Sequence, residues 1–521
     1  MSITRRTLIK SLAATVPALY LNPSILSPYA ARRSGPFEGS LESLKQYAIP
    51  DWFRNAKFGI WAHWGPQSAI EAGDWYARNM YMQGSRQYQY HVAHYGHPSK
   101  FGYKDTIKNW KAEAFDADYL MGLYKKAGAR YFMTMGVHHD NFDLWNSKLN
   151  PWNSVKMGPK KDIVGMFKKA AQKHDLKFGI SDHLWISPKW FSVSKGSDKE
   201  GPLAGVGYDG ASGAFDSLYG DSKKVYTELP WTEEGISEYW KQHWYERIKD
   251  LVDQYEPDLL YSDGQLPFQQ YGYNLLAHHY NKKAMGKKTQ AVYTSKRSSD
   301  SAAGICVLDV ERGVVDSIWP QPWQTDTCIG DWHYNKERVG HYKSVKTVID
   351  LLVDIVSRNG NLMLNFPLPA SGMLDSDELN VLEGITQWMK VNSEAIYDTR
   401  PWKIFGTGPQ SVVTKNDKEV NSAQQFNEKN RKQFTYEDIR FTKKDNILYA
   451  FFMGWPASGS QVIIKPLSTV SEQKIGSIET IELLGAGKLT FKRDEQGLKI
   501  DLPAQKPCDH AYALKISAKG I

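Results

Sequence analysis

Residues 257–264 read Pro-Asp-Leu-Leu-Tyr-Ser-Asp-Gly, a short apolar run that ends in a carboxylate and a glycine. An apolar run of this length, bounded by polar residues, predicts a buried strand. Similar runs recur before residue 370, separated by longer stretches of mixed polarity. The other predicted strands are Lys57–Trp64, Ala129–His139, Leu176–His183, Thr289–Lys296, Ile305–Glu311 and Gly360–Pro367.

The stretches between these runs have apolar residues at helical spacing. The predicted helices are Asp116–Ala127, Asp162–His174, Glu233–Tyr255 and Gly340–Ser357, and another long helix, Ser376–Val391, follows the last strand. Strands that alternate with helices predict parallel β-structure with helical crossovers. Seven or eight such units favour an α/β fold of the closed (β/α)8, TIM-like type over an open sheet.

The composition changes at about Arg400. Short β-type runs follow, split by Gly, Pro, Asn and Lys, and they predict a small antiparallel β-sandwich. These runs are Ile447–Met453, Gln461–Ile464, Ile478–Leu484, Leu498–Leu502 and Ala511–Ile516, with a polar loop over Thr414–Lys432. We therefore expect a catalytic barrel at residues 32–398 and a sandwich domain at residues 399–521.

The first 31 residues resemble a twin-arginine export signal. Arg5 and Arg6 precede a weakly apolar run from Ser11 to Leu21, and small residues follow at Ala30 and Ala31. Such a signal is removed after export, so the mature protein is expected in the periplasm or outside the cell. A basic, frayed terminus is the alternative. No other run is long enough to span a bilayer, which predicts no membrane insertion of the mature protein.

Charge and cysteine content exclude several classes of protein. The 65 basic and 57 acidic residues are mixed along the chain without a basic block, so no nucleic-acid partner is expected. The three cysteines form neither a disulfide framework nor a metal-binding spacing. The 18 Trp and 29 Tyr residues suit either an aromatic core or stacking on sugar rings.

Polar residues with useful chemistry stand at the ends of the predicted strands. They are His63, His138, His139, His183, Asp263, Arg297 and Glu311. A TIM-type barrel gathers the carboxyl ends of its strands at one face, where its active site lies. The pattern therefore predicts that these side chains, which are distant in sequence, converge on one site.

Two of these residues, Asp263 and Glu311, are carboxylates that each precede or nearly precede a glycine. Glycoside hydrolysis needs two carboxylates that face one site, one as nucleophile or stabiliser and one as acid/base. Structural roles remain open as well: Asp263 as a turn or helix-capping residue, and Glu311 as a surface ion pair. Asp309 lies two positions before Glu311 and would point to the same side.

The histidines allow three interpretations: donors to sugar hydroxyls, metal ligands, or structural residues at the barrel mouth. Adjacent strand residues point to opposite faces, so His138 and His139 cannot both face the site from a regular strand. The chain has no H-E-x-x-H motif.

Four longer motifs resemble those of the α-L-fucosidase family, glycoside hydrolase family 29, over about residues 52–402. They are Lys57–Gly65 (KFGIWAHWG), Val137–Phe142 (VHHDNF), Asn359–Asn365 (NGNLMLN) and Glu394–Trp402 (EAIYDTRPW). The second motif has Asn141 where the family usually has Gly. Separate motifs in the same order make a chance resemblance very unusual.

The resemblance implies a retaining double displacement that releases terminal α-L-fucose from an oligosaccharide or polysaccharide. Asp263 matches the family nucleophile, and Glu311 is the best match to the less uniform acid/base. No metal or organic cofactor is implied. The residues expected to hold the sugar are His63, Asp74, Trp75, His138, His139, His183 and Arg297. Trp319 and Trp323 are expected to line the leaving-group side.

Two departures from the family pattern bear on the substrate. Asp74 stands where Glu is common, and residues 179–183 (GISDH) replace a strand end that is commonly rich in Tyr. A roomier, more polar site could accept the additional C6 hydroxyl of L-galactose, so an α-L-galactosidase acting, for example, on algal galactans is the alternative. Two further classes of protein remain open: a non-catalytic carbohydrate-binding protein, and a metal-dependent hydrolase that uses His63, His138 and Asp140.

Overall fold

Eight parallel strands close into a barrel in the computed structural model, which describes residues 35–227, 231–411, 423, 425–457 and 461–521. Around the barrel the order is β1 (Phe58–Ala62), β10 (Gly360–Asn365), β9 (Trp323–Cys328), β8 (Val307–Glu311), β7 (Val292–Ser295), β4 (Leu259–Ser262), β3 (Lys177–Asp182) and β2 (Tyr131–Val137). The predicted (β/α)8-type barrel is confirmed. The predicted export signal falls on residues 1–31, outside the described residues.

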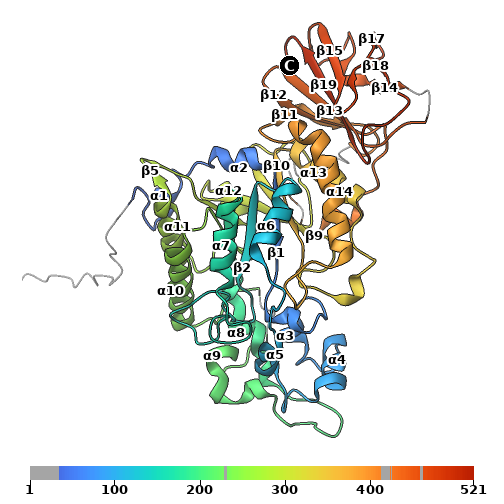
Figure 1. Ribbon diagram of the computed structural model, residues 1–521. Coiled ribbons are helices and arrows are strands. Elements are labelled where there is room, and N and C mark those ends of the chain that lie inside the picture. Colours follow the sequence, from blue (N-terminus) through green and yellow to red (C-terminus); the bar gives the residue numbers. More distant parts are fainter. Residues whose placement is uncertain (1–34, 228–230, 412–422, 424, 458–460) are drawn as a thin grey trace, which may run out of the picture. The chain divides into compact units, whose positions relative to one another are not determined.

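Six longer helices surround the strands (Figure 1). They are α6 (Ala117–Lys126), α7 (Ile163–Lys173), α10 (Glu238–Tyr255), α11 (Gln270–Lys282), α13 (Val345–Ser357) and α14 (Ser376–Asn392). The side chains of Asp116, Asp162 and Ser344 accept hydrogen bonds from the first turns of α6, α7 and α13, which explains why these helices begin there. The sequence did not predict α11 or β9.

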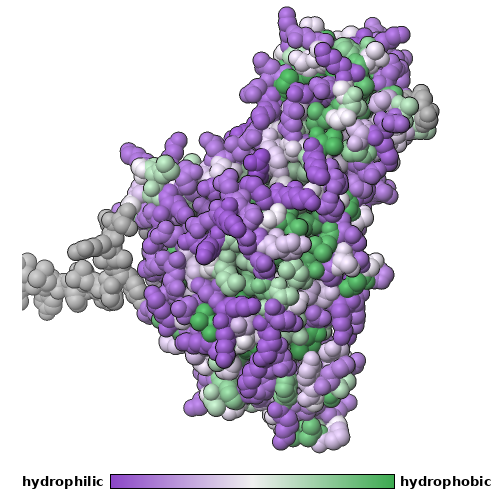
Figure 2. All heavy atoms as spheres, viewed as in Figure 1, coloured by the Kyte–Doolittle hydropathy of each residue, from purple (hydrophilic) through white to green (hydrophobic). Residues whose placement is uncertain are grey.

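Shorter elements occupy the connections. They include α1 (Leu41–Leu44), α2 (Asp51–Ala56), α3 (Tyr76–Asn79), α4 (Arg86–Tyr95), α5 (Tyr103–Asn109), α8 (Ser187–Trp190), α9 (Asp216–Tyr219), α12 (Ser298–Ala302) and the hairpin of β5 (Ala284–Met285) and β6 (Lys288–Thr289). Among the described residues, no helix is both long and apolar enough to cross a membrane. The face of the molecule in Figure 2 is mostly hydrophilic, with apolar residues in separate patches.

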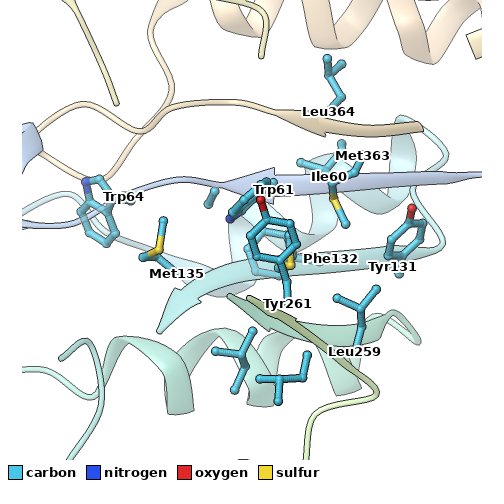
Figure 3. Close-up of a cluster of buried hydrophobic side chains, with 14 of the residues drawn as sticks. Ile60, Trp61, Trp64, Tyr131, Phe132, Met135, Leu259, Tyr261, Met363 and Leu364 are labelled. Carbon is cyan, nitrogen blue, oxygen red and sulfur yellow. The ribbon is translucent and has the colours of Figure 1, made fainter. Parts of the chain in front are cut away.

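The barrel interior is filled by large side chains. Trp61 on β1 and Tyr261 on β4 point toward one another, with ring centroids 5.1 Å apart (Figure 3). Nearer the amino-terminal end, the ring of Tyr131 occupies the space beside Gly59, where a Cβ atom would lie 2.5 Å from it. Because side chains alternate along a strand, residues 61 and 63 of the chain face the same side, as do 261 and 263. The packed rings therefore form a floor beneath His63 and Asp263.

Two antiparallel sheets follow the barrel. One has the order β11 (Arg400–Thr407), β12 (Ile439–Lys444), β13 (Ile447–Phe452), β19 (Tyr512–Ala518), β15 (Ile478–Leu483) and β16 (Gly487–Lys488); the other has β14 (Gln461–Ile464), β18 (Leu498–Asp501) and β17 (Phe491–Arg493). Side chains from both sheets share one apolar core, so the predicted sandwich is confirmed. Part of the predicted loop Thr414–Lys432 lies outside the described residues.

A buried charge cluster joins α13 of the barrel to the chain that follows β11. The Asp354 carboxylate contacts three guanidinium groups: Arg358 at 3.1 Å, Arg431 at 2.5 Å, and Arg440 on β12. Burial alone would raise the pKa of Asp354, but the three guanidinium groups hold it far below its usual value. The carboxylate is therefore ionised, and it neutralises part of a buried cluster of positive charge.

Replacing this carboxylate should destabilise the protein strongly. In Asp354→Asn the three arginines lose a fully buried anionic partner, which should lower the free energy of unfolding by about 3–5 kcal/mol. Urea unfolding followed by tryptophan fluorescence measures this change. Asp494→Asn removes an exposed partner of Lys499 and is the matched control, for which little change is expected. Equal losses in both variants would contradict the importance assigned to this cluster.

Candidate active site

Asp263 and Glu311 meet around one ammonium group at the carboxyl ends of β4 and β8. Lys296, directly after β7, places its Nζ atom 2.7 Å from Asp263 Oδ1 and 2.6 Å from Glu311 Oε2. The two oxygens therefore cannot be farther apart than the sum of these distances, which agrees with the about 5–5.5 Å separation of carboxyl groups in retaining glycosidases. The side chains of Asp263 and Glu311 are 11% and 16% exposed, so both can be reached from solvent.

Two histidines approach the other oxygen of Asp263. His139 Nε2 lies 3.3 Å and His183 Nδ1 lies 3.5 Å from Asp263 Oδ2, and His139 Nδ1 donates to the carbonyl oxygen of His183 at 2.6 Å. The hydroxyl of Tyr261 lies 3.1 Å from Asp263 Oδ1. Burial alone would raise the pKa of Asp263, but Lys296 and these histidines hold it well below its usual value. The carboxylate is ionised throughout the neutral range.

Two further acids lie beneath this group, inside the barrel. Asp326 Oδ2 is 3.7 Å from Lys296 Nζ, and Asp309 accepts a hydrogen bond from Gln324 at 2.9 Å. Burial, together with the neighbouring carboxylates of Glu311 and Asp263, raises the pKa of Asp326 to about 7. Burial and Asp326 raise the pKa of Asp309 well above its usual value. Asp309 is fully buried, which leaves Glu311 as the acid of β8 that reaches solvent.

Glu311 has a neighbour that the sequence did not indicate. Trp332, in the connection after β9, donates from its indole nitrogen to Glu311 Oε1 at 3.1 Å. The indole ring also lies 5.6 Å from the ring of Trp61 and 5.5 Å from that of His63. Trp332 therefore spans the space between the acid on β8 and the histidine after β1.

A second polar group gathers around His63. The side chains of His63, Asp74, His138 and His333 each offer an atom within 4.8 Å of the others, a spacing that could hold a metal ion or several hydroxyl groups. His333 Nδ1 lies 2.6 Å from Asp74 Oδ1. Gln67 donates to His138 Nδ1 at 2.8 Å, so the neutral ring carries its proton on Nε2, which disfavours that nitrogen as a metal ligand.

The ring nitrogens of His63 are buried and have no hydrogen-bond partner among the described residues. Burial, with the neighbouring histidines, lowers the pKa of His63 well below its usual value, so the ring is neutral. Asp140, which a metal-dependent hydrolase would need as a ligand, instead accepts a hydrogen bond from Tyr103. The group around His63 is thus more suited to neutral polar ligands than to the metal site of such a hydrolase.

Trp75 belongs to an aromatic group on the same side. Its ring lies 6.3 Å from that of His139, 5.9 Å from Trp190 and 5.7 Å from Trp231, with all distances between centroids. Trp231 is 45% exposed, whereas Trp190 is buried. These rings offer an apolar wall next to the histidine that contacts Asp263.

Three predicted site residues lie elsewhere. Arg297 is exposed at the N-terminus of α12, and its neighbour Lys296 occupies the site because alternate residues of an extended chain point to opposite sides. Trp323 begins β9, at the opposite end of the barrel from Glu311, and its indole donates to the carbonyl of Arg358 at 2.9 Å. The main-chain amide of Trp319 donates to the same carbonyl. The prediction that Trp319 and Trp323 line the leaving-group side is therefore wrong.

Comparison with known proteins identifies the family. The α-L-fucosidase family model matches residues 25–394, and the model of the α-L-fucosidase C-terminal domain matches residues 431–517. Rat plasma α-L-fucosidase is 28% identical over 512 residues, which cover 94% of this chain and 96% of the rat protein. Human tissue α-L-fucosidase is 26% identical, with 91% and 90% covered.

Solved structures agree with these matches. Thermotoga maritima α-fucosidase is 26% identical, with a TM-score of 0.69 and coverage of 92% of this chain and 100% of that one. The same enzyme in complex with fucose gives a TM-score of 0.68 at 26% identity, with 92% and 99% covered. Since the family model spans more than half of the sequence, the chain belongs to the α-L-fucosidase family of glycoside hydrolases.

Proposed function

We propose that this enzyme releases terminal α-L-fucose from glycans by a double displacement that retains the anomeric configuration. The observation that carries the proposal is the placement of Asp263 and Glu311 on either side of Lys296 Nζ, at 2.7 and 2.6 Å. Two carboxylates this close leave no room for the water molecule that an inverting mechanism needs between the general-base carboxylate and the sugar. The family membership and the relatives named as α-L-fucosidases support fucose as the sugar.

In the first step, an oxygen of Asp263 forms a bond to C1 of the sugar while the bond from C1 to the leaving oxygen breaks. Glu311 supplies the proton to the departing oxygen. In the second step, water attacks C1, its proton passes to Glu311, and the ester bond to Asp263 breaks. The enzyme returns to its starting state, and the sugar is released with the configuration it had in the substrate.

Lys296 has a double role in this scheme. Its positive charge keeps Asp263 ionised and ready to attack, and it also holds the oxygen of Glu311 that faces the nucleophile. The neutral rings of His63 and His138 are suited to hydrogen bonds with sugar hydroxyls, because each imidazole offers one donor and one acceptor. The apolar wall with Trp75 suits stacking on the sugar.

Variants of the two carboxylates test the mechanism. Asp263→Asn should abolish turnover without unfolding the protein. In the wild-type reaction, followed by proton NMR, the first anomer of the free sugar to appear should be α. Glu311→Ala should slow the release of poor leaving groups by about 10²–10⁴-fold, the usual contribution of a general acid, and spare aryl fucosides with acidic phenols. A β product, or equal losses on both substrate types, would refute these assignments.

The charge on Lys296 should govern the acid limb of the pH profile. Without the ammonium group, the pKa of Asp263 rises toward or above its usual value because burial then dominates. As the pH falls, Lys296→Met should therefore lose activity at a higher pH than the wild type does. The loss of this preorganised donor should also lower kcat by about 10²–10³-fold. Arg297→Met removes the adjacent exposed cation and is the matched control. An unchanged acid limb in Lys296→Met, or an equal shift in both, would contradict this role.

One observation favours a second candidate, an α-L-galactosidase. Apart from its 3.5 Å contact with Asp263, His183 has no hydrogen-bond partner for its buried ring among the described residues. The ring lies 5.5 Å from that of Tyr261 and 6.0 Å from that of Trp61. Burial lowers the pKa of His183 to about 4, so the ring is neutral at pH 7. With the proton of the neutral ring on Nδ1, which faces the ionised Asp263, Nε2 is an acceptor. A buried acceptor of this kind suits a C6 hydroxyl, which L-galactose has and fucose lacks.

The two sugars can be distinguished by comparing nitrophenyl α-L-fucoside with nitrophenyl α-L-galactoside. If His183 binds a C6 hydroxyl, His183→Phe should lower the galactoside-to-fucoside ratio of kcat/KM by about tenfold, the value of one hydrogen bond. Effects of His183 on the nucleophile cancel in this ratio. If the wild type prefers the fucoside and His183→Phe does not change this preference, fucose remains the proposed substrate and the second candidate is excluded.

We also propose that the protein is exported, on the strength of Arg5 and Arg6 before the apolar run. N-terminal sequencing of the mature protein from the periplasm or the medium tests this, and a chain that keeps residues 1–31 in the cytoplasm would contradict it.

A further inference from the structure

A segment from beyond the barrel holds the main chain of Glu311. Residues 425–431 lie between β11 and β12 in sequence, but they pack along the end of β8. The amide of Glu311 donates to the side-chain oxygen of Gln425, and the amide of Phe426 donates to the carbonyl of Glu311 at 2.8 Å. Both main-chain polar groups of the proposed acid/base thus have partners in this segment.

The amide group of Gln425 reaches two further residues of the site. Its Nε2 atom donates to the carbonyl oxygen of Asp309 at 3.2 Å and lies 3.5 Å from that of Lys296. The orientation of the side-chain amide follows from this network, because its oxygen must face an N–H group and its nitrogen must face carbonyl groups. One half-buried side chain therefore connects the main chain of β8 with the main chain at Lys296.

The segment itself is held firmly by other contacts. Asn427 exchanges two hydrogen bonds with the main chain of Val314, at 3.0 and 2.9 Å. Glu428 accepts from Thr327 at 2.7 Å and pairs with Lys343 at 2.9 Å. Residues 425–430 lie in the interval between the two family-model matches, which end at 394 and resume at 431. The support for Glu311 is thus supplied by a part of the chain that neither model describes.

The position of Glu311 depends on such support because β8 ends there. Arg312, the next residue, has a φ of 46°, so the chain turns sharply out of the strand. Misplacement of a catalytic group by about 1 Å can cost as much as 10²-fold in rate. A change in the Gln425 side chain would therefore act on the leaving-group step through the geometry of Glu311.

We propose that Gln425 is a positioning residue for Glu311, so that the region after the barrel completes the acid/base half of the active site. This inference rests on the proposed function. Gln425 does not touch the reacting atoms; it fixes the main chain that carries Glu311 and, through Lys296, the distance between acid and nucleophile.

The test compares kcat/KM of Gln425→Ala on two substrates, a fucosyl disaccharide and an aryl fucoside with a strongly acidic phenol. Loss of positioning should slow the disaccharide by about ten- to a hundredfold, part of the contribution of a general acid, and should change the aryl fucoside little. Gln425→Glu keeps an acceptor for the Glu311 amide but loses the donor to the carbonyl oxygens of Asp309 and Lys296, so it should recover only part of the loss.

Asn427→Ala is the matched control, since it removes two hydrogen bonds from the same segment without touching Glu311. Thermal unfolding of all variants reports their stability. Equal losses on both substrates in Gln425→Ala would overturn the proposal, as would a leaving-group dependence that is larger in Asn427→Ala than in Gln425→Ala. Glu311→Ala distinguishes two kinds of failure. If the Gln425 test fails but Glu311→Ala still slows poor leaving groups more than good ones, only the role of Gln425 is wrong. If Glu311→Ala shows no such dependence, the assignment of Glu311 as acid/base is wrong as well.

Discussion

Closure of the barrel is the constraint on which the site depends. β1 pairs in parallel with both β2 and β10, with Phe58 opposite Leu362 in one register and Gly59 opposite Tyr131 in the other. Because every pairing in the barrel is parallel, all eight strands point the same way, and closure then brings their carboxyl ends into a single ring. His63, Asp263 and Glu311, which are distant in sequence, then face one another without any local signal that connects them.

Within that ring, charge is arranged unevenly. One ammonium group, on Lys296, stands among four carboxyl groups, two near solvent and two buried. The deeper pair, Asp309 and Asp326, can remain in place because burial raises both pKa values, which favours protonation and reduces the repulsion between the carboxyl groups. The pair near solvent makes the short contacts with the lysine. Depth in the barrel therefore divides chemically similar groups into two that are closed off from solvent and two that solvent can reach, a distinction that depends on position rather than on residue type.

How much the sequence could predict follows from the same physics. Seven barrel strands are apolar runs and were predicted from the sequence, but β9 contains Gln324, Thr325, Asp326 and Thr327, whose side chains are buried against other polar groups, so it lacks the apolar signal. The strand-end acids and histidines followed from the barrel pattern. Whether Lys296 or Arg297 points inward depends on the phase of one short strand, and the family pattern favoured the wrong one. Trp332 and Gln425 lie on connecting loops, and the sequence has no periodic pattern there from which the course of the chain could be predicted.

The docking of residues 425–431 on β8 has a consequence for biosynthesis. A ribosome that has completed the last barrel strand, β10, has still to add about sixty residues before the hydrogen-bond partners of Glu311 exist. Until then the nascent barrel contains Asp263 and Lys296, but Glu311 lacks its hydrogen-bond partners in this segment. Under the proposed assignment, catalytic competence therefore arrives late in translation, together with Arg431 and Arg440, two of the three arginines that neutralise Asp354. A chain truncated after the barrel would lack both the support of Glu311 and these two partners of Asp354.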